Sequence, residues 1–134
     1  MMKLSPAAEL AVRGVIELAA RYGQGPITLD TICSRRKLSR QYLTKMFNML
    51  ARVGVVTTFR GKRGGYALAK KPSQITLLEV IEAVEGPVVL NICQQTPPQC
   101  NQTACVIRPV WAELQKTIRQ KLGKIRISDC LNGR

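Results

Sequence analysis

Two short helices in tandem, with a glycine-rich hairpin directly after them, limit most narrowly how this chain can fold. Thr28 and Ser39 are favourable helix N-caps, and each precedes a segment with apolar residues at helical spacing. Residues 55–59 are mostly β-branched and residues 66–68 resume the strand, so the glycine-containing segment between them predicts the tip of a β-hairpin. A helix-turn-helix followed directly by a hairpin is the element order of a winged helix.

Apolar residues at helical spacing predict three further helices. The first covers about residues 7–22 and stops at the segment GQGP, and another opens at the capping-box pair Thr76 and Glu79 and ends near Gly86. The last carries a long apolar stripe made of Val106, Val110, Trp111, Leu114, Ile118 and Leu122. Such a helix must bury its stripe, either against its own domain or against a second copy of the chain.

The positive charge of the chain is concentrated in its first half. Residues 1–71 hold 14 Lys or Arg against 3 acidic residues, and residues 72–134 hold 7 against 5, so the halves contribute +11 and +2 to the net charge of +13. A basic half of this kind attracts polyanions through counterion release, and nucleic acid is the commonest such partner. The alternative is a solvated basic surface without a partner.

The helix that begins after Ser39 has a polar face suited to reading double-stranded DNA. With the apolar residues toward the core, the helical period places Gln41, Lys45 and Asn48 away from it. Gln and Asn pair with adenine in the major groove, and Lys reaches guanine or a phosphate. We expect DNA contacts from Ser39, Arg40, Gln41, Tyr42, Thr44, Lys45 and Asn48. The alternative is an ordinary polar helix face.

The tip of the predicted hairpin adds a second basic element. Arg60, Lys62 and Arg63 supply charge for phosphates or a narrow minor groove, and the neighbouring glycines permit a tight turn close to a backbone. The tip does not match a phosphate-binding loop, which needs Gly-Lys-Ser/Thr and a helix immediately after it. Its position after the helix-turn-helix predicts a wing that contacts DNA.

Cys93, Cys100 and Cys105 crowd into thirteen residues with turn chemistry, in a chain without histidine. Five cysteines, an odd number, fit a paired disulfide framework poorly. A metal held here would need thiolates together with a carboxylate, an amide or a backbone group. An iron-sulfur cluster, a zinc site and direct thiol oxidation without metal are the alternatives. Cys33 fits a buried helical stripe, and Cys130 is assigned no role.

Several classes of protein are disfavoured. An enzyme is not expected, because triads that use histidine are impossible and no paired carboxylates stand out. An iron-sulfur electron-transfer protein would normally supply four cysteines and has no need of a basic winged helix. The charged start and the absence of roughly 18 consecutive apolar residues predict a cytoplasmic protein that does not contact membranes.

These observations predict a mainly α fold with a small β-hairpin wing. We expect a winged-helix DNA-binding domain at residues 1–87, a cysteine-containing cluster-binding loop at residues 88–105, and a dimerisation helix with a C-terminal segment at residues 106–134. A chain of 134 residues suffices for one core and an appendage but not for two full-sized domains. Residues 88–105 are called the cysteine loop below.

Five segments of the chain also carry a family likeness: MKLS, LSRQYLTKMFNMLARVGVV, RGKRGGYALAK, ITLLEVIEAVEGP, and the cysteine loop running into CVIRPVWAEL. Together they resemble the IscR/NsrR family of winged-helix iron-sulfur regulators over nearly the whole chain. The resemblance implies a homodimeric, sequence-specific repressor or activator whose long helix, at about residues 105–123, crosses that of its twin. A two-fold dimer of this kind implies a palindromic operator. The signal would be redox state, nitric oxide or iron-sulfur supply.

The resemblance also implies a ligand set for a [2Fe-2S] or [4Fe-4S] cluster. Family members that bind a cluster use three cysteines of this loop, which correspond to Cys93, Cys100 and Cys105. Their spacing, C-x6-C-x4-C, departs from the more even family pattern, although the overall span is similar. In the cluster-assembly regulators a histidine follows the third cysteine by three positions; Arg108 stands there and cannot serve.

The fourth ligand is left to another residue. In the nitric-oxide-sensing branch an acidic residue near the start of the first helix, donated by the other subunit, completes the set, and Glu9 occupies the matching place. Glu9, Arg13 and Glu17 are also spaced four residues apart, so they could instead form a surface ion-pair ladder.

Overall fold

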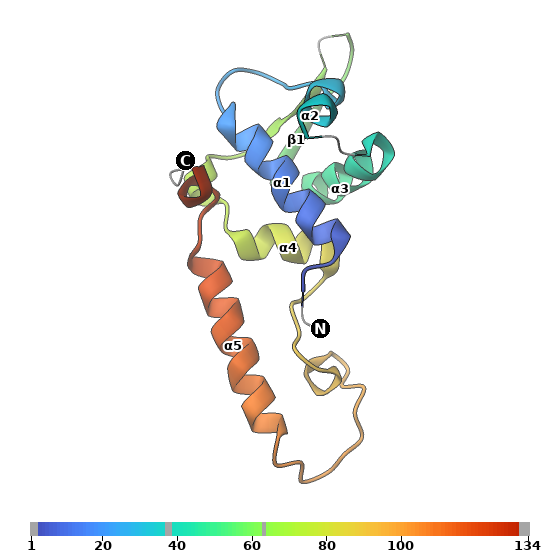
Figure 1. The fold of residues 1–134 in the computed structure, drawn as a ribbon, viewed down its shortest axis with the longest axis vertical. Coiled ribbons are helices and arrows are strands. Elements are labelled where there is room, and N and C mark those ends of the chain that lie inside the picture. The colour runs from blue at the N-terminus through green and yellow to red at the C-terminus, as the bar shows by residue number, and fades with distance from the viewer. Residues whose placement is uncertain (1–2, 37–38, 63, 132–134) are drawn as a thin grey trace.

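The computed structural model describes residues 3–36, 39–62 and 64–131 (Figure 1). The helices are α1 (Pro6–Ala20), α2 (Leu29–Arg36), α3 (Arg40–Arg52), α4 (Leu77–Glu85) and α5 (Arg108–Lys124). The strands β1 (Val56–Phe59) and β2 (Gly65–Leu68) form an antiparallel hairpin, and short 3-10 helices lie at η1 (Pro72–Gln74), η2 (Ile92–Gln94) and η3 (Ile127–Leu131). The predicted fold class, mainly α with a small hairpin wing, is confirmed.

Side-chain caps fix where several helices begin. Three predicted N-caps accept a hydrogen bond from the backbone N–H three residues further on: Thr28 at 3.2 Å, Ser39 at 3.4 Å and Thr76 at 3.1 Å. Each bond satisfies one of the N–H groups that the first helical turn leaves without a partner. The carboxylate of Glu79, in the first turn of α4, forms an ion pair with Lys70 at 3.0 Å.

The core lies where α1 and α4 pack against α3. Its largest fully buried side chains are those of Val15, Leu18, Ile32, Leu43, Phe47, Leu50, Val55, Ile75, Val80 and Ile127. Gly14 allows the close approach of α1, because a Cβ at this position would stand 2.8 Å from Cε1 of Phe47. The ring of Phe47 also packs against that of Tyr66, with centroids 4.7 Å apart, which ties α3 to the wing.

The wing is the hairpin of residues 56–68, and its base is anchored to the segment before α2. Ile27 and Tyr66 exchange backbone hydrogen bonds of 2.8 and 2.9 Å. Gly65 makes this contact possible, since its φ is +151° and a Cβ there would lie 2.3 Å from the carbonyl oxygen of Ile27. The wing is thereby held beside the start of α2 and near α3.

The chain after α5 returns to the core, a feature that periodicity did not predict. The N–H of Leu77 donates to the carbonyl of Ile125, and the N–H of Ile127 donates to that of Ile75, both at 2.9 Å. Ile127 is completely buried. Residues 125–127 therefore pair with residues 75–77 in the manner of two short strands and fasten the end of α5 to the winged-helix part of the chain.

Helix α5 extends away from the rest of the molecule, with the cysteine loop running alongside it (Figure 1). It begins at Arg108, slightly later than predicted, and Val106 precedes it with 92% of its surface exposed. Arg119 of α5 forms an ion pair with Glu82 of α4, which holds the two helices together at one point. Across the described ranges, no helix is long and apolar enough to cross a membrane.

Candidate nucleic-acid interface and cysteine loop

A groove of about 630 Å³ lies between α3 and the wing, and we call it the α3–wing groove. Helix α3 contributes Arg40, Thr44 and Asn48, which recur every four residues and so share one helix face. The wing contributes Arg60 and Lys62 from the opposite side. The fold thus brings together five of the residues that were predicted to contact DNA.

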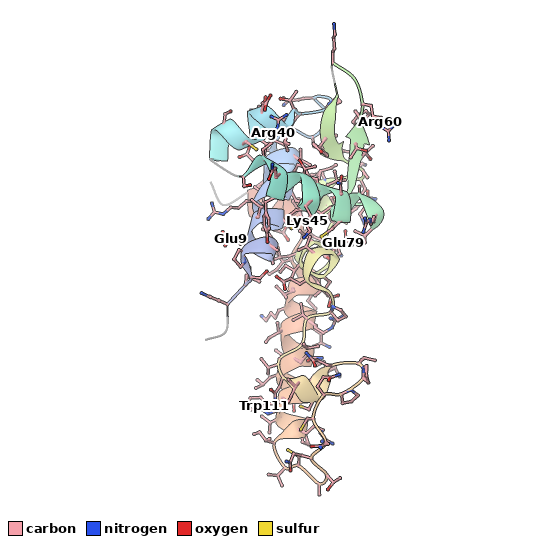
Figure 2. The ribbon with its side chains drawn as sticks, turned by 90° about the vertical axis from the view of Figure 1, so that its right-hand side faces the viewer. Glu9, Arg40, Lys45, Arg60, Glu79 and Trp111 are labelled. Atoms are coloured by element: carbon pink, nitrogen blue, oxygen red, sulfur yellow. The ribbon has the colours of Figure 1, made fainter. Side chains whose placement is uncertain are left out.

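The other predicted DNA contacts lie on or near the same surface. Gln41 and Lys45 are exposed on α3, and Figure 2 shows Lys45 with Arg40 and Arg60 in the part of the molecule distant from Trp111. Tyr42 is also exposed. Ser39 serves as the N-cap of α3. Arg63, which was predicted to act with the wing, lies outside the described residues.

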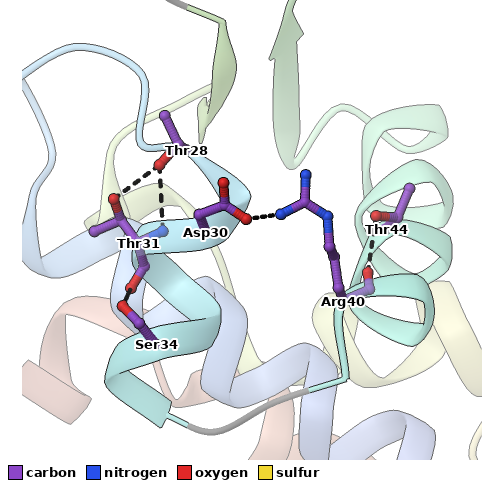
Figure 3. A network of polar contacts seen from close by, with 6 residues as sticks. All are labelled: Thr28, Asp30, Thr31, Ser34, Arg40 and Thr44. Atoms are coloured by element: carbon purple, nitrogen blue, oxygen red, sulfur yellow. Dashed lines mark hydrogen bonds and ion pairs between the residues drawn. The ribbon is translucent and has the colours of Figure 1, made fainter.

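Arg40 sits in a polar network that links α2 to α3 (Figure 3). Its guanidinium forms an ion pair with the carboxylate of Asp30, in the first turn of α2. Its backbone carbonyl accepts a hydrogen bond from the hydroxyl of Thr44 at 2.9 Å. On the other side of Asp30, the hydroxyls of Thr28 and Thr31 are hydrogen-bonded at 2.8 Å. The first residue of α3 is therefore held both by its own helix and by α2.

The groove is also lined by residues that were not predicted to contact DNA, among them Asp30, Thr58 and Phe59. An acidic side chain is not expected on a surface for DNA, so a search for basic and amide groups passes over Asp30. Phe59 is a partly exposed aromatic residue at the end of β1, where a strand pattern alone suggests burial on one face. The sequence feature that could have identified Phe59 as a groove residue is its position next to the basic tip of the hairpin.

The cysteine loop carries three partly buried free thiols. Cys93 lies in η2, whereas Cys100 and Cys105 lie in the irregular segment that leads to α5. The sulfur of Cys93 accepts hydrogen bonds from the side-chain amides of Gln94 at 3.3 Å and Asn91 at 3.8 Å. The side chains on either side of the Cys93 sulfur therefore hold it in place within the loop.

Side chains of α4 and α5 hold the first residues of the cysteine loop. The carboxylate of Glu82 accepts a hydrogen bond from the N–H of Val88 at 2.7 Å while it pairs with Arg119. The side-chain carbonyl of Gln115 accepts from the N–H of Leu90 at 3.0 Å. Glu82 therefore joins α4, α5 and the cysteine loop at one carboxylate.

The predicted metal ligands are not brought together in a single chain. Glu9 forms an ion pair with Arg13 at 2.5 Å, and about half of each side chain is exposed, as the surface-ladder alternative expects for this pair. Glu17, the third residue of that ladder, is buried instead. Among the residues that the structure describes, no three Cys, Asp or Glu side chains lie close enough to one another to hold a metal ion. Cys33 packs against the core on α2, where burial raises the pKa of its thiol.

A known protein family matches nearly the whole chain. The family described as "Rrf2: Iron-dependent Transcriptional regulator" matches residues 4–133. The chain belongs to the Rrf2 family. It is therefore a transcription regulator of a DNA-binding family and not an enzyme, as predicted from its basic winged helix and its lack of histidine.

Individual Rrf2 relatives match the chain over nearly its full length. IscR of Photorhabdus laumondii is 31% identical over 131 residues, which cover 98% of this chain and 80% of that protein. The structure of CymR of B. subtilis, titled the global cysteine regulator, is 28% identical with a TM-score of 0.82, covering 97% and 96% of the two chains. IscR of T. potens is 30% identical with a TM-score of 0.79, covering 97% and 86%. The predicted resemblance to winged-helix regulators of the IscR type is thereby confirmed.

Proposed function

We propose that this Rrf2 regulator binds a palindromic DNA operator as a homodimer and adjusts its affinity for DNA through the cysteine loop. The α3–wing groove carries the proposal for DNA, because Arg40, Thr44 and Asn48 face Arg60 and Lys62 across it. A helix face with amide and guanidinium groups suits base edges in the major groove, and a basic hairpin suits phosphates or the minor groove. Gln41 and Lys45 extend the same surface along α3.

The apolar stripe of α5 supports the homodimer. Val110, Leu114 and Ile118 recur every four residues and expose 46%, 45% and 39% of their surfaces. Burial of such a stripe is favourable, and a second α5 offers a matching apolar surface in a two-fold arrangement. A two-fold dimer places two α3 helices on two half-sites, which is why a palindromic operator is expected.

For the cysteine loop we propose an iron-sulfur cluster, either [2Fe-2S] or [4Fe-4S], held by Cys93, Cys100 and Cys105. Three free thiols within one loop are the donors that such clusters use, and the family description is iron-dependent. Because these residues do not form a metal-binding group within the described part of one chain, the loop must rearrange to bind. When bound, the cluster would supply an oxidant- or nitric oxide-reactive centre. Glu9 from the partner chain is the proposed fourth ligand.

Direct oxidation of a thiol is the second candidate for sensing, and Cys93 is the residue that favours it. Two side-chain amides donate to its sulfur and hold it in place, and a free thiol that is partly exposed can be reached by oxidants. This candidate needs no metal and no contribution from Glu9.

Metal analysis of protein purified without oxygen separates these candidates. The cluster proposal predicts a coloured protein with equimolar iron and sulfide, and loss of both in the Cys93→Ala, Cys100→Ala and Cys105→Ala variants. The Cys33→Ala variant is the matched control and should retain iron, because Cys33 packs against the core. A colourless protein with one zinc per chain, or with no metal and an oxidisable Cys93, would reject the cluster.

A further inference from the structure

Asp30 is the acidic side chain among the described residues that line the α3–wing groove. Its carboxylate is largely exposed, and it forms an ion pair with Arg40 (Figure 3). An ion pair between two exposed side chains contributes little to the stability of a fold. A carboxylate on this surface also repels DNA phosphates, so Asp30 lowers non-specific attraction to DNA. The ion pair therefore matters less for the stability of the fold than for the position of the Arg40 side chain.

Asp30 and Arg40 belong to two helices that are packed into the core. Asp30 belongs to the first turn of α2, and Arg40 is the first residue of α3. Ile32 of α2 and Leu43 of α3 are both buried in the core, so the two helices are fixed relative to each other. The hydroxyl of Thr44 bonds to the carbonyl of Arg40 and adds a local constraint. The long side chain of Arg40 retains freedom at the surface, and its ion pair with Asp30 restricts that freedom.

A guanidinium group held in one orientation recognises a guanine better than a group that turns freely. Arginine recognises guanine through two parallel hydrogen bonds to O6 and N7, and this requires the planar group to be presented in one orientation. A carboxylate occupies at most two of the five N–H donors, which leaves the others for a base. Without the carboxylate, Arg40 would be free to turn to the nearest phosphate, which carries no sequence information.

We propose that Asp30 is a positioning residue that directs Arg40 to a guanine, so that base preference at one position of each half-site depends on Asp30. The inference rests on the proposed function, because it requires DNA to enter the α3–wing groove. It assigns Asp30 to specificity and not to affinity. Removing its charge should strengthen binding to DNA in general while weakening discrimination at one base pair.

Selection from a pool of randomised DNA duplexes, followed by sequencing, tests this inference. The wild-type full-length chain should select a sequence that contains a guanine contacted by Arg40. Asp30→Asn should lower the preference for that guanine at least tenfold, retain the preferences at other positions, and bind the unselected pool several-fold more tightly. Arg40→Lys should lose preference at the same position, because lysine cannot form the paired hydrogen bonds.

Two further variants separate positioning from charge and from folding. Glu85→Gln removes an equal charge from the exposed end of α4, outside the groove, and should keep the wild-type sequence preference. Asp30→Glu keeps the carboxylate and should restore part of the preference for guanine. Thermal unfolding of each variant reports whether the fold is retained.

The outcomes of the selection are distinguishable. An Asp30→Asn protein that selects guanine at the Arg40 position as strongly as wild type overturns the inference, as does an Arg40→Lys protein with unchanged preference. A wild-type protein that selects no sequence contradicts the proposed function itself. If Asp30→Asn unfolds, the other two variants test the inference. A preference for guanine that is lost in Arg40→Lys and partly retained in Asp30→Glu supports the positioning role of Asp30. Any other pattern contradicts that role.

Discussion

At the scale of single residues, Gly14 allows α1 to pack closely against α3. A Cβ at this position would lie 2.8 Å from Cε1 of Phe47 and 3.1 Å from Cδ1 of Leu43. Overpacking in a dense core costs about 1–3 kcal/mol, whereas alanine gains only about 1 kcal/mol over glycine in a helix. Gly14→Ala should therefore lower the free energy of unfolding, as measured in urea.

The matched control for this substitution is Gly123→Ala in α5. A Cβ there would meet Cδ2 of Leu78 at 3.6 Å, which is an ordinary van der Waals contact. Gly123→Ala should stabilise the protein by up to about 1 kcal/mol through helix propensity. If both variants were stabilised alike, the close packing of α1 on α3 would be wrong.

Arg60 in the wing leads to a second prediction at the residue scale. If Arg60 neutralises a phosphate, Arg60→Gln should weaken binding to all DNA sequences similarly and reduce the slope of log K against log salt by about 1. Lys116→Gln, on the exposed surface of α5, removes the same charge outside the groove and should leave the slope nearly unchanged. Equal effects of the two variants would remove the wing from the interface.

The residues of the candidate site were predictable to different degrees. Arg40, Thr44 and Asn48 followed from the helical period of α3 once its apolar face was identified, and they line the groove. Asp30 did not, because the sequence separates it from Arg40 by ten positions and only the packing of α2 against α3 brings them together. Periodicity identifies the face of one helix, but it does not identify contacts between two helices.

At the scale of secondary-structure elements, local signals account for what could be predicted. Thr28, Ser39 and Thr76 are N-caps whose bonds are made within one turn, so the starts of α2, α3 and α4 follow from the sequence. The pairing of residues 125–127 with residues 75–77 has no local signal, because it joins segments that are 50 positions apart. Short non-local pairings of this kind emerge only in the folded chain.

Ile127 tests whether the end of α5 is part of the core. Because its side chain is completely buried, Ile127→Ala should lower the free energy of unfolding by about 2–5 kcal/mol. The control is Ile125→Ala, two residues earlier at a partly exposed position, which should cost clearly less. Equal small effects in denaturant titrations would show that the C-terminal segment does not pack as described.

At the scale of the whole molecule, α5 and the cysteine loop extend away from the winged-helix part of the chain (Figure 1). The stripe residues Val110, Leu114 and Ile118 of α5 leave 39–46% of their surfaces exposed. The proposed homodimer would bury this stripe. A charge within it should then prevent association, since an unpaired carboxylate is costly to bury. The double variant Leu114→Glu with Ile118→Glu should therefore sediment as a monomer and bind a palindromic operator much more weakly than wild type.

Ala112 provides the control on the same helix. It lies roughly opposite the stripe on the helical period and is exposed, so Ala112→Glu should leave the dimer intact. Sedimentation velocity at several protein concentrations distinguishes the two cases. A wild-type chain that sediments as a monomer at every concentration would contradict the dimer, and with it the expectation of a palindromic operator.

The proposed coupling of the cysteine loop to DNA binding would pass through the side chains that connect the loop to the helices, among them Glu82, Arg108 and Gln115. The most direct measurement is the affinity for a selected operator of one anaerobic preparation, before and after its iron is removed by chelation. We expect removal of iron to change the affinity of the wild-type protein for the operator at least tenfold in either direction, and to leave the affinity of Cys93→Ala unchanged. Equal affinities of the iron-loaded and iron-free wild-type protein would contradict it.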